Sequence, residues 1–221
     1  TANNDLGIVG VAPDVKLMAF KACWHDTLTQ AASCDSVSLM KALMAVLKQQ
    51  PDILNLSLSG PSDPLIESLL KAASDQGIVL VSARDEKRRN SFPASMTEVI
   101  GVGTPLGISQ SASIPVSASG LNGMTDDPYG VLAPGTDILT TTPGATYAFR
   151  TGSSLASAYV SGIAALMKER QPALSGRQIE LHLRNTSRVI INTIPVVDMC
   201  AALRRNDELC PGNSMTQVTD E

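Results

Sequence analysis

Helical and strand patterns alternate in the first half of the chain, and this alternation constrains the fold more than any other feature. Residues 37–49 place apolar side chains at helical spacing, and residues 53–58 have the pattern of a buried strand. Ser62 or Asp63 can cap a second helix, and residues 78–81 form an aliphatic run typical of a strand covered on both faces. Strands and helices in this order, with short connections, predict a parallel sheet with right-handed crossovers.

The second half of the chain continues the α/β pattern. Residues 99–102 and 136–142 predict two further strands, and residues 109–129, rich in Ser, Gly, Asp and Pro, predict a loop. A helix made largely of small residues is expected from Ser154 to about Arg170. Small residues let neighbouring elements approach closely, so this helix should be central and buried. Ser175 can cap a last helix.

Charge and hydropathy exclude two kinds of partner. The 221 residues include 17 basic and 21 acidic side chains, for a net charge of −4, and the longest basic cluster is Lys87–Arg89. Because a nucleic-acid-binding surface needs a basic patch or stripe, no nucleic acid partner is expected. No apolar run approaches the roughly 18 residues that mark a transmembrane helix, so no membrane span is expected either.

The cysteines fall into two local pairs, Cys23 with Cys34 and Cys200 with Cys210. An even count in local pairs favours two disulfides and predicts a secreted or periplasmic protein. Four free thiols in a cytosolic protein are the alternative. Zinc is a weaker one, because Cys23, His25 and Cys34 lack the tight spacing of the usual ligand pairs.

A Gly-Ser-Ser sequence at Gly152–Ser154 stands at the start of the small-residue helix. The hydroxyl of a serine in the first turn of a helix lies near backbone N–H groups that favour developing negative charge. This placement suits a nucleophile whose attack creates an oxyanion. Serine is also one of the best N-cap residues, and most Gly-Ser-Ser sequences at a helix start are only caps.

The wider context of this serine resembles the subtilisin-like serine peptidases, the subtilase or S8-type family. Gly152–Ala158 followed by Val160–Gly162 is similar to the family's serine motif, Gly-Thr-Ser-Met-Ala-Thr-Pro followed by Val-Ala-Gly. Further blocks resemble the family in the same order, so that the likeness covers roughly residues 1–190; they are Asn3–Pro13, Leu54–Gly60, Phe92–Ser95 with Val99–Gly103, and Ala133–Gly135. Several motifs in register are far more specific than one.

The resemblance implies a fold and a set of site residues. The fold would be three-layer α/β/α around a mostly parallel central sheet, with the N-terminal part of the domain absent. Ser154 matches the nucleophile. The backbone edge that pairs with an extended peptide or protein substrate matches four consecutive residues, which are Ser57, Leu58, Ser59 and Gly60. No cofactor would be required. Asn4 matches a ligand of a structural calcium loop, although Asn-Asn-Asp is also an ordinary turn sequence.

The rest of the family's catalytic triad has no counterpart in this sequence. The family's aspartate and histidine motifs precede the block that matches Asn3–Pro13, and neither His25 nor His182 stands in a family context. The chain is therefore expected to be the C-terminal two-thirds of a peptidase domain over residues 1–210, with a polar tail at 211–221. An upstream segment, deleted here or present as a separate chain after processing, would supply the missing residues.

The expected oxyanion position also departs from the family. Where the family usually has Ala-Ala-Gly-Asn, this chain reads Ser82-Ala83-Arg84-Asp85-Glu86, and a carboxylate there would repel the charge that it should stabilise. Two hypotheses follow. The parent protein is a serine endopeptidase, and this chain is inactive by itself. Alternatively, the protein is a catalytically inactive, subtilase-like scaffold that binds extended peptides.

Overall fold

The computed structural model describes residues 7–26, 31–85, 91–105, 130–191 and 194–204. At the centre lies a parallel sheet of four strands in the order β3-β4-β5-β6. These strands are β3 (Ile53–Leu56), β4 (Val79–Ala83), β5 (Val99–Gly103) and β6 (Val131–Leu132). The predicted strand at 53–58 is therefore two residues shorter than expected, and the strands expected at 78–81 and 99–102 are confirmed.

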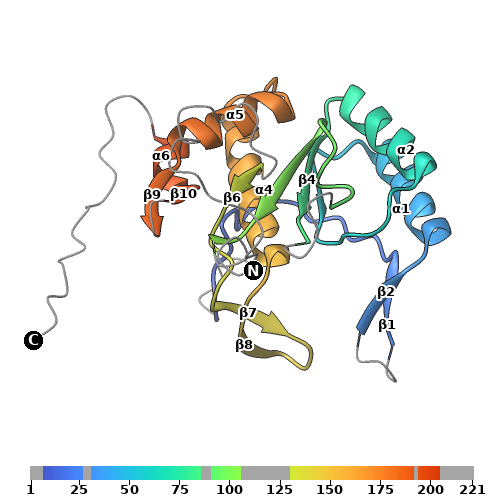
Figure 1. The fold of residues 1–221 in the computed structure, drawn as a ribbon, viewed down its shortest axis with the longest axis horizontal. Helices are drawn as coiled ribbons and strands as arrows, with labels where there is room; N and C mark the ends of the chain where they lie inside the picture. Colours follow the sequence, from blue (N-terminus) through green and yellow to red (C-terminus); the bar gives the residue numbers. More distant parts are fainter. Residues whose placement is uncertain (1–6, 27–30, 86–90, 106–129, 192–193, 205–221) are drawn as a thin grey trace, which may run out of the picture.

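Helices cover both faces of this sheet, which confirms the three-layer α/β/α fold (Figure 1). On one face lie α1 (Ser36–Gln49) and α2 (Pro64–Asp75). On the other lie α4 (Ser153–Arg170), α5 (Gly176–Thr186) and α6 (Met199–Leu203). As predicted, the small-residue helix α4 is central: it packs against β3, β4 and β5.

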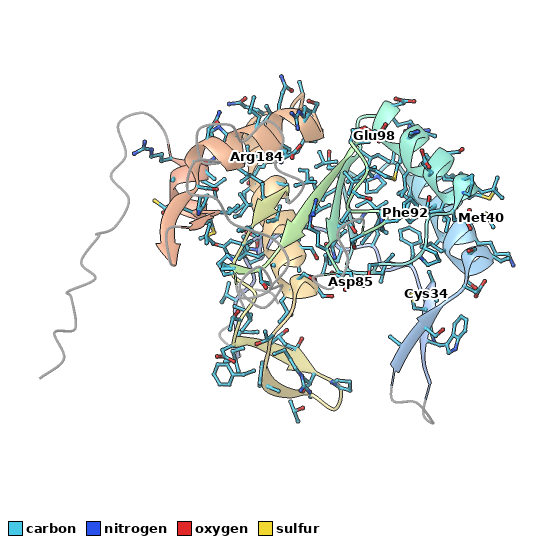
Figure 2. All side chains as sticks on the ribbon, in the orientation of Figure 1. Cys34, Met40, Asp85, Phe92, Glu98 and Arg184 are labelled. Atoms are coloured by element: carbon cyan, nitrogen blue, oxygen red, sulfur yellow. A yellow bond between two sulfur atoms is a disulfide. The ribbon has the colours of Figure 1, made fainter. Side chains whose placement is uncertain are left out.

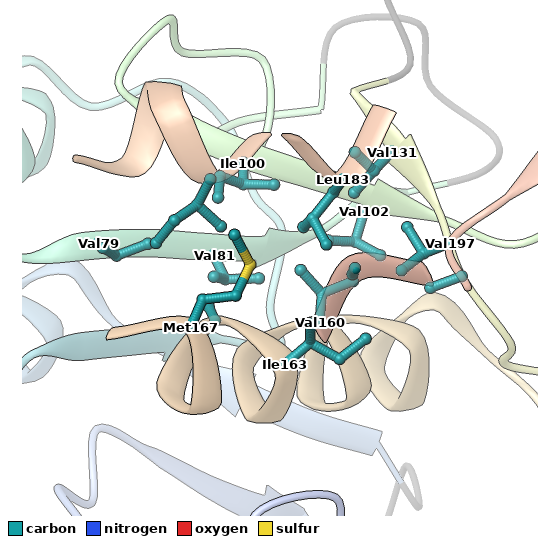
Figure 3. Packing of buried hydrophobic residues seen from close by; sticks show 14 of the residues in the cluster. Val79, Val81, Ile100, Val102, Val131, Val160, Ile163, Met167, Leu183 and Val197 are labelled. Atoms are coloured by element: carbon teal, nitrogen blue, oxygen red, sulfur yellow. The ribbon is translucent and has the colours of Figure 1, made fainter. Parts of the chain in front are cut away.

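Strand β4 shows how the sequence divides its side chains between the two layers. Val79 and Val81 point into the core formed with α4 and α5, while Leu80, between them, points into the core formed with α1 and α2. Because successive side chains of a strand point to opposite faces, an unbroken aliphatic run is what a strand covered on both sides requires. Figure 3 shows Val79 and Val81 packed with Met167 of α4.

Side chains cap the helices that the sequence predicted. The Asp35 carboxylate accepts from the Ser38 amide at the start of α1, and the Asp63 carboxylate accepts from the amides of Leu65 and Ile66 in α2. Hydrogen bonds, the first of them from the Ser36 hydroxyl, lower the pKa of Asp63. At α5 a capping box is present, as expected from Ser175.

Within the described residues, three two-stranded antiparallel ribbons lie outside the central sheet: β1 (Cys23–Asp26) with β2 (Ala31–Cys34), β7 (Ile138–Thr142) with β8 (Thr146–Arg150), and β9 (Arg188–Ile191) with β10 (Ile194–Val196). The strand predicted at 136–142 is thus part of a hairpin and not of the parallel sheet. The loop predicted at 109–129 and the boundary predicted at residue 210 lie outside the described residues. Among the described helices, none is both long and apolar enough to cross a bilayer.

Candidate functional site

Ser154 lies in the first turn of α4, where the helix begins beside the end of β3. The residue before the helix is Gly152, which has no side chain to cap the first-turn amides, and its own amide donates to the carbonyl of Gly135 at 2.8 Å. The other long helices that the structure describes, α1, α2 and α5, begin with a side-chain cap, so among these four α4 alone has first-turn N–H groups without a side-chain cap. Such groups favour negative charge close to Ser154.

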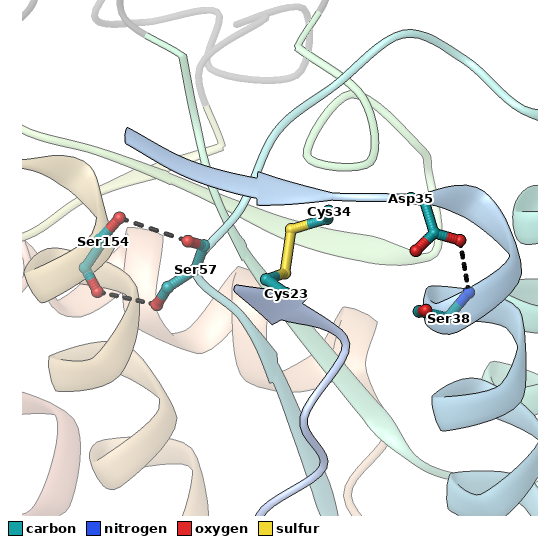
Figure 4. The surroundings of a disulfide bond; sticks show 6 residues. All are labelled: Cys23, Cys34, Asp35, Ser38, Ser57 and Ser154. Atoms are coloured by element: carbon teal, nitrogen blue, oxygen red, sulfur yellow. Dashed lines mark hydrogen bonds between the residues drawn. A yellow bond between two sulfur atoms is a disulfide. The ribbon is translucent and has the colours of Figure 1, made fainter. Parts of the chain in front are cut away.

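Two hydrogen bonds join Ser154 to Ser57, the residue that follows β3 (Figure 4). The Ser154 hydroxyl donates to the carbonyl oxygen of Ser57 at 3.4 Å, and the Ser57 hydroxyl donates to the carbonyl oxygen of Ser154 at 3.0 Å. Both side chains are exposed to solvent. The structure therefore brings together the nucleophile candidate and the first residue of the predicted substrate-pairing edge, although 97 residues separate them in sequence.

A row of polar side chains supports this contact. The Asn55 amide donates to the Ser57 hydroxyl at 2.9 Å, and the Ser57 and Ser157 hydroxyls lie 2.9 Å apart. The Ser161 hydroxyl, one turn further along α4, lies 3.1 Å from the side-chain oxygen of Asn55. Asn55, Ser157 and Ser161 were missed in the sequence analysis. The signal was the spacing of serines 154, 157 and 161, because residues three and four apart share one helix face.

Ser153 ties the start of α4 to the end of β4. Its hydroxyl donates to the carbonyl oxygen of Arg84 at 2.5 Å. Arg84 is followed in sequence by Asp85, which occupies the predicted oxyanion position. The backbone amide of Asp85 donates to the Ser91 hydroxyl at 2.8 Å. Figure 2 marks Asp85 at this end of the sheet. Asp85 therefore follows, in sequence, the residue whose carbonyl holds the start of α4; Glu86 lies outside the described residues.

The residues of the predicted substrate-pairing edge differ in their contacts and in their exposure. Leu58 packs partly against the core beneath α1 and α2, whereas Ser59 is exposed. The amide of Gly60 donates to the carbonyl oxygen of Phe92 at 3.0 Å, in an antiparallel bridge. Because that amide already has a partner, an added strand would pair with Ser57–Ser59. The carbonyl oxygens of Ser57 and Leu58 each already accept one hydrogen bond, from the hydroxyls of Ser154 and Ser82.

A general base for Ser154 is not seen within the described residues, where its hydroxyl bonds only to the Ser57 carbonyl. His182 is on α5, and its Nε2 lies 2.9 Å from the carbonyl oxygen of Ala202. The backbone of His25 belongs to β1, and its side chain lies outside what the structure describes. As the sequence indicated, a serine without a base is a poor nucleophile at neutral pH.

The cysteine pairs bear on stability and on metal binding. Cys23 and Cys34 form a disulfide that joins β1 to β2, so these thiols are not zinc ligands (Figure 4). Cys200 is also disulfide-bonded, while Cys210 lies outside the described residues. Asn4, assigned to calcium, lies outside them as well. Over the described ranges, no group of three or more His, Cys, Asp or Glu side chains is arranged to hold a metal ion.

Solved structures share this architecture. A cold-adapted subtilisin-like serine proteinase matches with a TM-score of 0.60 at 20% identity, over 75% of this chain and 60% of that protein. Fervidolysin from Fervidobacterium pennivorans, a keratinolytic enzyme related to subtilisin, matches with a TM-score of 0.59 at 20% identity, over 76% of this chain and 28% of that protein. At this identity the likeness concerns the fold.

Sequence comparison identifies the family. The M-protease of Shouchella clausii (strain KSM-K16) is 32% identical over 194 residues, which are 86% of this chain and 48% of the relative. Subtilisin Savinase of Lederbergia lenta is 32% identical over 188 residues, which are 84% of this chain and 65% of the relative. The chain thus spans between about half and two-thirds of these relatives' length. The model of the subtilase family matches residues 1–214. The chain therefore belongs to the subtilase family.

Proposed function

We propose that the parent protein is a serine endopeptidase of the subtilisin type, in which Ser154 is the nucleophile. The observation that carries this proposal is the position of its exposed hydroxyl in the uncapped first turn of α4, 3.4 Å from the backbone of the predicted substrate edge. Relatives named as proteases and subtilisins support the same activity. The substrate would be an extended stretch of peptide or protein.

In this proposal the peptide backbone pairs with Ser57–Ser59 and adds a strand beside the end of β3. The Ser154 oxygen then attacks the scissile carbonyl, and the carbonyl electrons move onto the oxygen. First-turn N–H groups of α4 stabilise that negative charge. Collapse of the intermediate breaks the C–N bond and leaves the acyl group on Ser154, and water later releases it.

The base and its orienting acid would come from an upstream segment of the same protein, as a continuous chain or as a separate one after processing. A histidine on that segment takes the Ser154 proton and gives it to the leaving amine, while an aspartate holds the histidine in place. On this basis the 221-residue chain alone has no peptidase activity. The match covers 48% of the M-protease and 65% of Savinase, so each of these relatives has further residues outside it.

Fluorophosphonate labelling of the full-length protein, followed by intact mass under denaturing conditions, tests the assignment of Ser154. One adduct is expected on the unaltered protein and none on Ser154→Ala. Ser68→Ala is the matched control, because Ser68 is an exposed serine on α2 whose hydroxyl also bonds to backbone. An adduct that survives in Ser154→Ala would refute the assignment.

The location of Asp85 favours a second candidate function, an inactive scaffold that binds extended peptides. Asp85 stands at the predicted oxyanion position, directly after the Arg84 carbonyl that Ser153 contacts, and a carboxylate at that position opposes the oxyanion that catalysis requires. In that case, a peptide would bind along Ser57–Ser59 and remain uncut. Turnover of a chromogenic peptide by the full-length protein, abolished by Ser154→Ala, would exclude the scaffold.

We also propose export to the cell exterior or the periplasm. The Cys23–Cys34 disulfide supports this location, because disulfides persist in oxidising compartments. A structural calcium ion held in part by Asn4 remains a prediction, and the proposed serine chemistry needs no other cofactor. Mass measurement of the native protein before and after alkylation under denaturing conditions tests the cystines: no thiol should react until a reductant is added.

A further inference from the structure

The hairpin formed by β7 and β8 presents an apolar face to solvent. Leu139 is paired with Phe149 and Thr141 with Tyr147, so these four side chains lie on the same face, which we call the hairpin face. Its three large side chains are well exposed: 41% for Leu139, 49% for Tyr147 and 66% for Phe149. The opposite face, which includes Ile138, Thr140 and Ala148, is the more buried one.

In an amphipathic hairpin the apolar face is normally buried and the polar face is exposed, whereas here the apolar face is the exposed one. Burial of apolar surface is the main stabilising contribution, and a two-stranded hairpin without a covered face is marginal in water. Within the described residues β7 and β8 pair only with each other, and the hairpin extends away from the central sheet (Figure 1). Contiguous exposed apolar side chains of this kind mark an interaction surface.

The described chain enters at this same place. The backbone of Gly7 lies directly against the ring of Tyr147, so that a β-carbon at position 7 would collide with the phenol oxygen. Gly7 has a φ of 68°, a conformation that glycine adopts at no steric cost. The first described residue of the chain therefore lies against the hairpin face.

We propose that the hairpin face is the docking surface for the segment that precedes Thr1 in the full-length protein, through apolar side chains of that segment. The proposal rests on the proposed function, in which this segment carries the missing histidine and aspartate. The contact of Gly7 with Tyr147 supports it, and the relatives leave room for such a segment, because the match covers 65% of Savinase and 48% of the M-protease. Strand β8 ends at Arg150 and α4 begins at Ser153, so docking brings the segment close to Ser154.

Photo-crosslinking tests this docking directly. The full-length protein would carry Ser154→Ala, to prevent self-cleavage, and p-benzoylphenylalanine in place of Phe149. After irradiation, peptide mass spectrometry should find position 149 joined to a peptide that precedes Thr1. The matched control places the same photoreactive residue at Leu65, which is 62% exposed on α2. The control should give no crosslink to that segment.

Three outcomes would overturn the proposal: a crosslink from position 149 to a second copy of the protein, crosslinks to the upstream segment in equal yield from positions 149 and 65, or no crosslink from position 149. A second measurement avoids the photoreactive residue. Phe149→Ser in the full-length Ser154→Ala protein should raise hydrogen exchange of the upstream peptides at least tenfold, while Leu65→Ser should leave it unchanged. Equal exchange in both variants counts against docking.

These tests separate docking from catalysis. Both are carried out on an inactive variant and read out structure alone, so an absence of hydrolysis in the unaltered protein would refute the proposed function and leave the docking result intact. Conversely, an active full-length protein without the position 149 crosslink would refute only the docking surface.

Discussion

The Ser154 hydroxyl and the Ser57 backbone carbonyl oxygen lie 3.4 Å apart, and the Ser57 hydroxyl returns a hydrogen bond to the Ser154 carbonyl oxygen at 3.0 Å. This reciprocal pair fixes the start of α4 against the end of β3. A nucleophile gains from such fixation, because small displacements of reacting groups are costly in rate. Ser57 is therefore a positioning residue in the proposed site.

Replacing Ser57 with alanine removes the hydroxyl and keeps the backbone edge. One hydrogen bond contributes about 0.5–1.5 kcal/mol, so kcat of the full-length protein should fall about two- to tenfold. KM should change little, because substrate pairs with backbone. Steady-state hydrolysis of a chromogenic peptide checks both values, with Ser68→Ala as the control. A rise in KM at constant kcat would contradict a positioning role.

Asp85→Asn should raise the activity of the full-length protein. The substitution removes a negative charge from the predicted oxyanion position and adds a side-chain N–H donor in its place. Removal of one oxyanion donor from a subtilisin, itself a relative, costs about 10²–10³ in kcat, and that known magnitude bounds the expected gain. Asp75→Asn, at the far end of α2, is the charge-matched control. A kcat at or below that of the unaltered protein would show that Asp85 does not limit the reaction.

Gly162→Leu should destabilise the protein. A β-carbon at this position would come within 2.7 Å of the Val11 β-carbon, so the segment that packs on α4 would have to move. Overpacking of this kind costs about 1–3 kcal/mol, and helix propensity returns roughly 1 kcal/mol, so the expected net loss is up to about 2 kcal/mol. Urea denaturation of the full-length Ser154→Ala protein measures the change. Ala158→Leu, exposed on the same helix, should cost far less, and equal losses would contradict the close contact.

Tyr159→Phe should flatten the alkaline limb of the stability profile. Burial, followed by the nearby Asp198 carboxylate, raises the pKa of Tyr159 above its usual value near 10, and a hydrogen bond from the Met199 amide opposes the shift. A group whose pKa is raised by folding contributes stability below its unfolded pKa and loses it as pH rises through the folded pKa. Unfolding free energy should therefore fall above about pH 10 in the unaltered protein.

Urea midpoints between pH 8 and pH 11.5 would measure this difference, with unaltered protein and Tyr159→Phe compared at each pH. Parallel curves for the two proteins would contradict the role of Tyr159. Other titrating groups contribute equally to both of them, so only the difference between curves is informative.

Local sequence signals determined most of the elements. Asp63 and Ser175 cap α2 and α5 because short polar side chains satisfy first-turn amides within three residues of themselves. The aliphatic run at 79–81 is also predicted from local sequence. Successive side chains of a strand point to opposite faces, so an unbroken aliphatic run indicates a strand that is covered on both faces. The strand at 138–142 shows the limit, since β-branched residues suit a hairpin as well as a parallel sheet.

The candidate site depended on contacts that no local pattern contains. The sequence indicated Ser154 and the edge at Ser57 as separate motifs, and only the packing of α4 on β3 placed their hydroxyl and carbonyl groups within hydrogen-bonding reach. Two further hydrogen bonds likewise join residues that are far apart in sequence: the Ser161 hydroxyl donates to the Asn55 side chain, and the Gly60 amide donates to the Phe92 carbonyl oxygen. Helix caps and strand alternation depend on residues a few positions apart, so the sequence predicts them directly. The site is formed by side chains about 100 residues apart, which tertiary packing alone brings together.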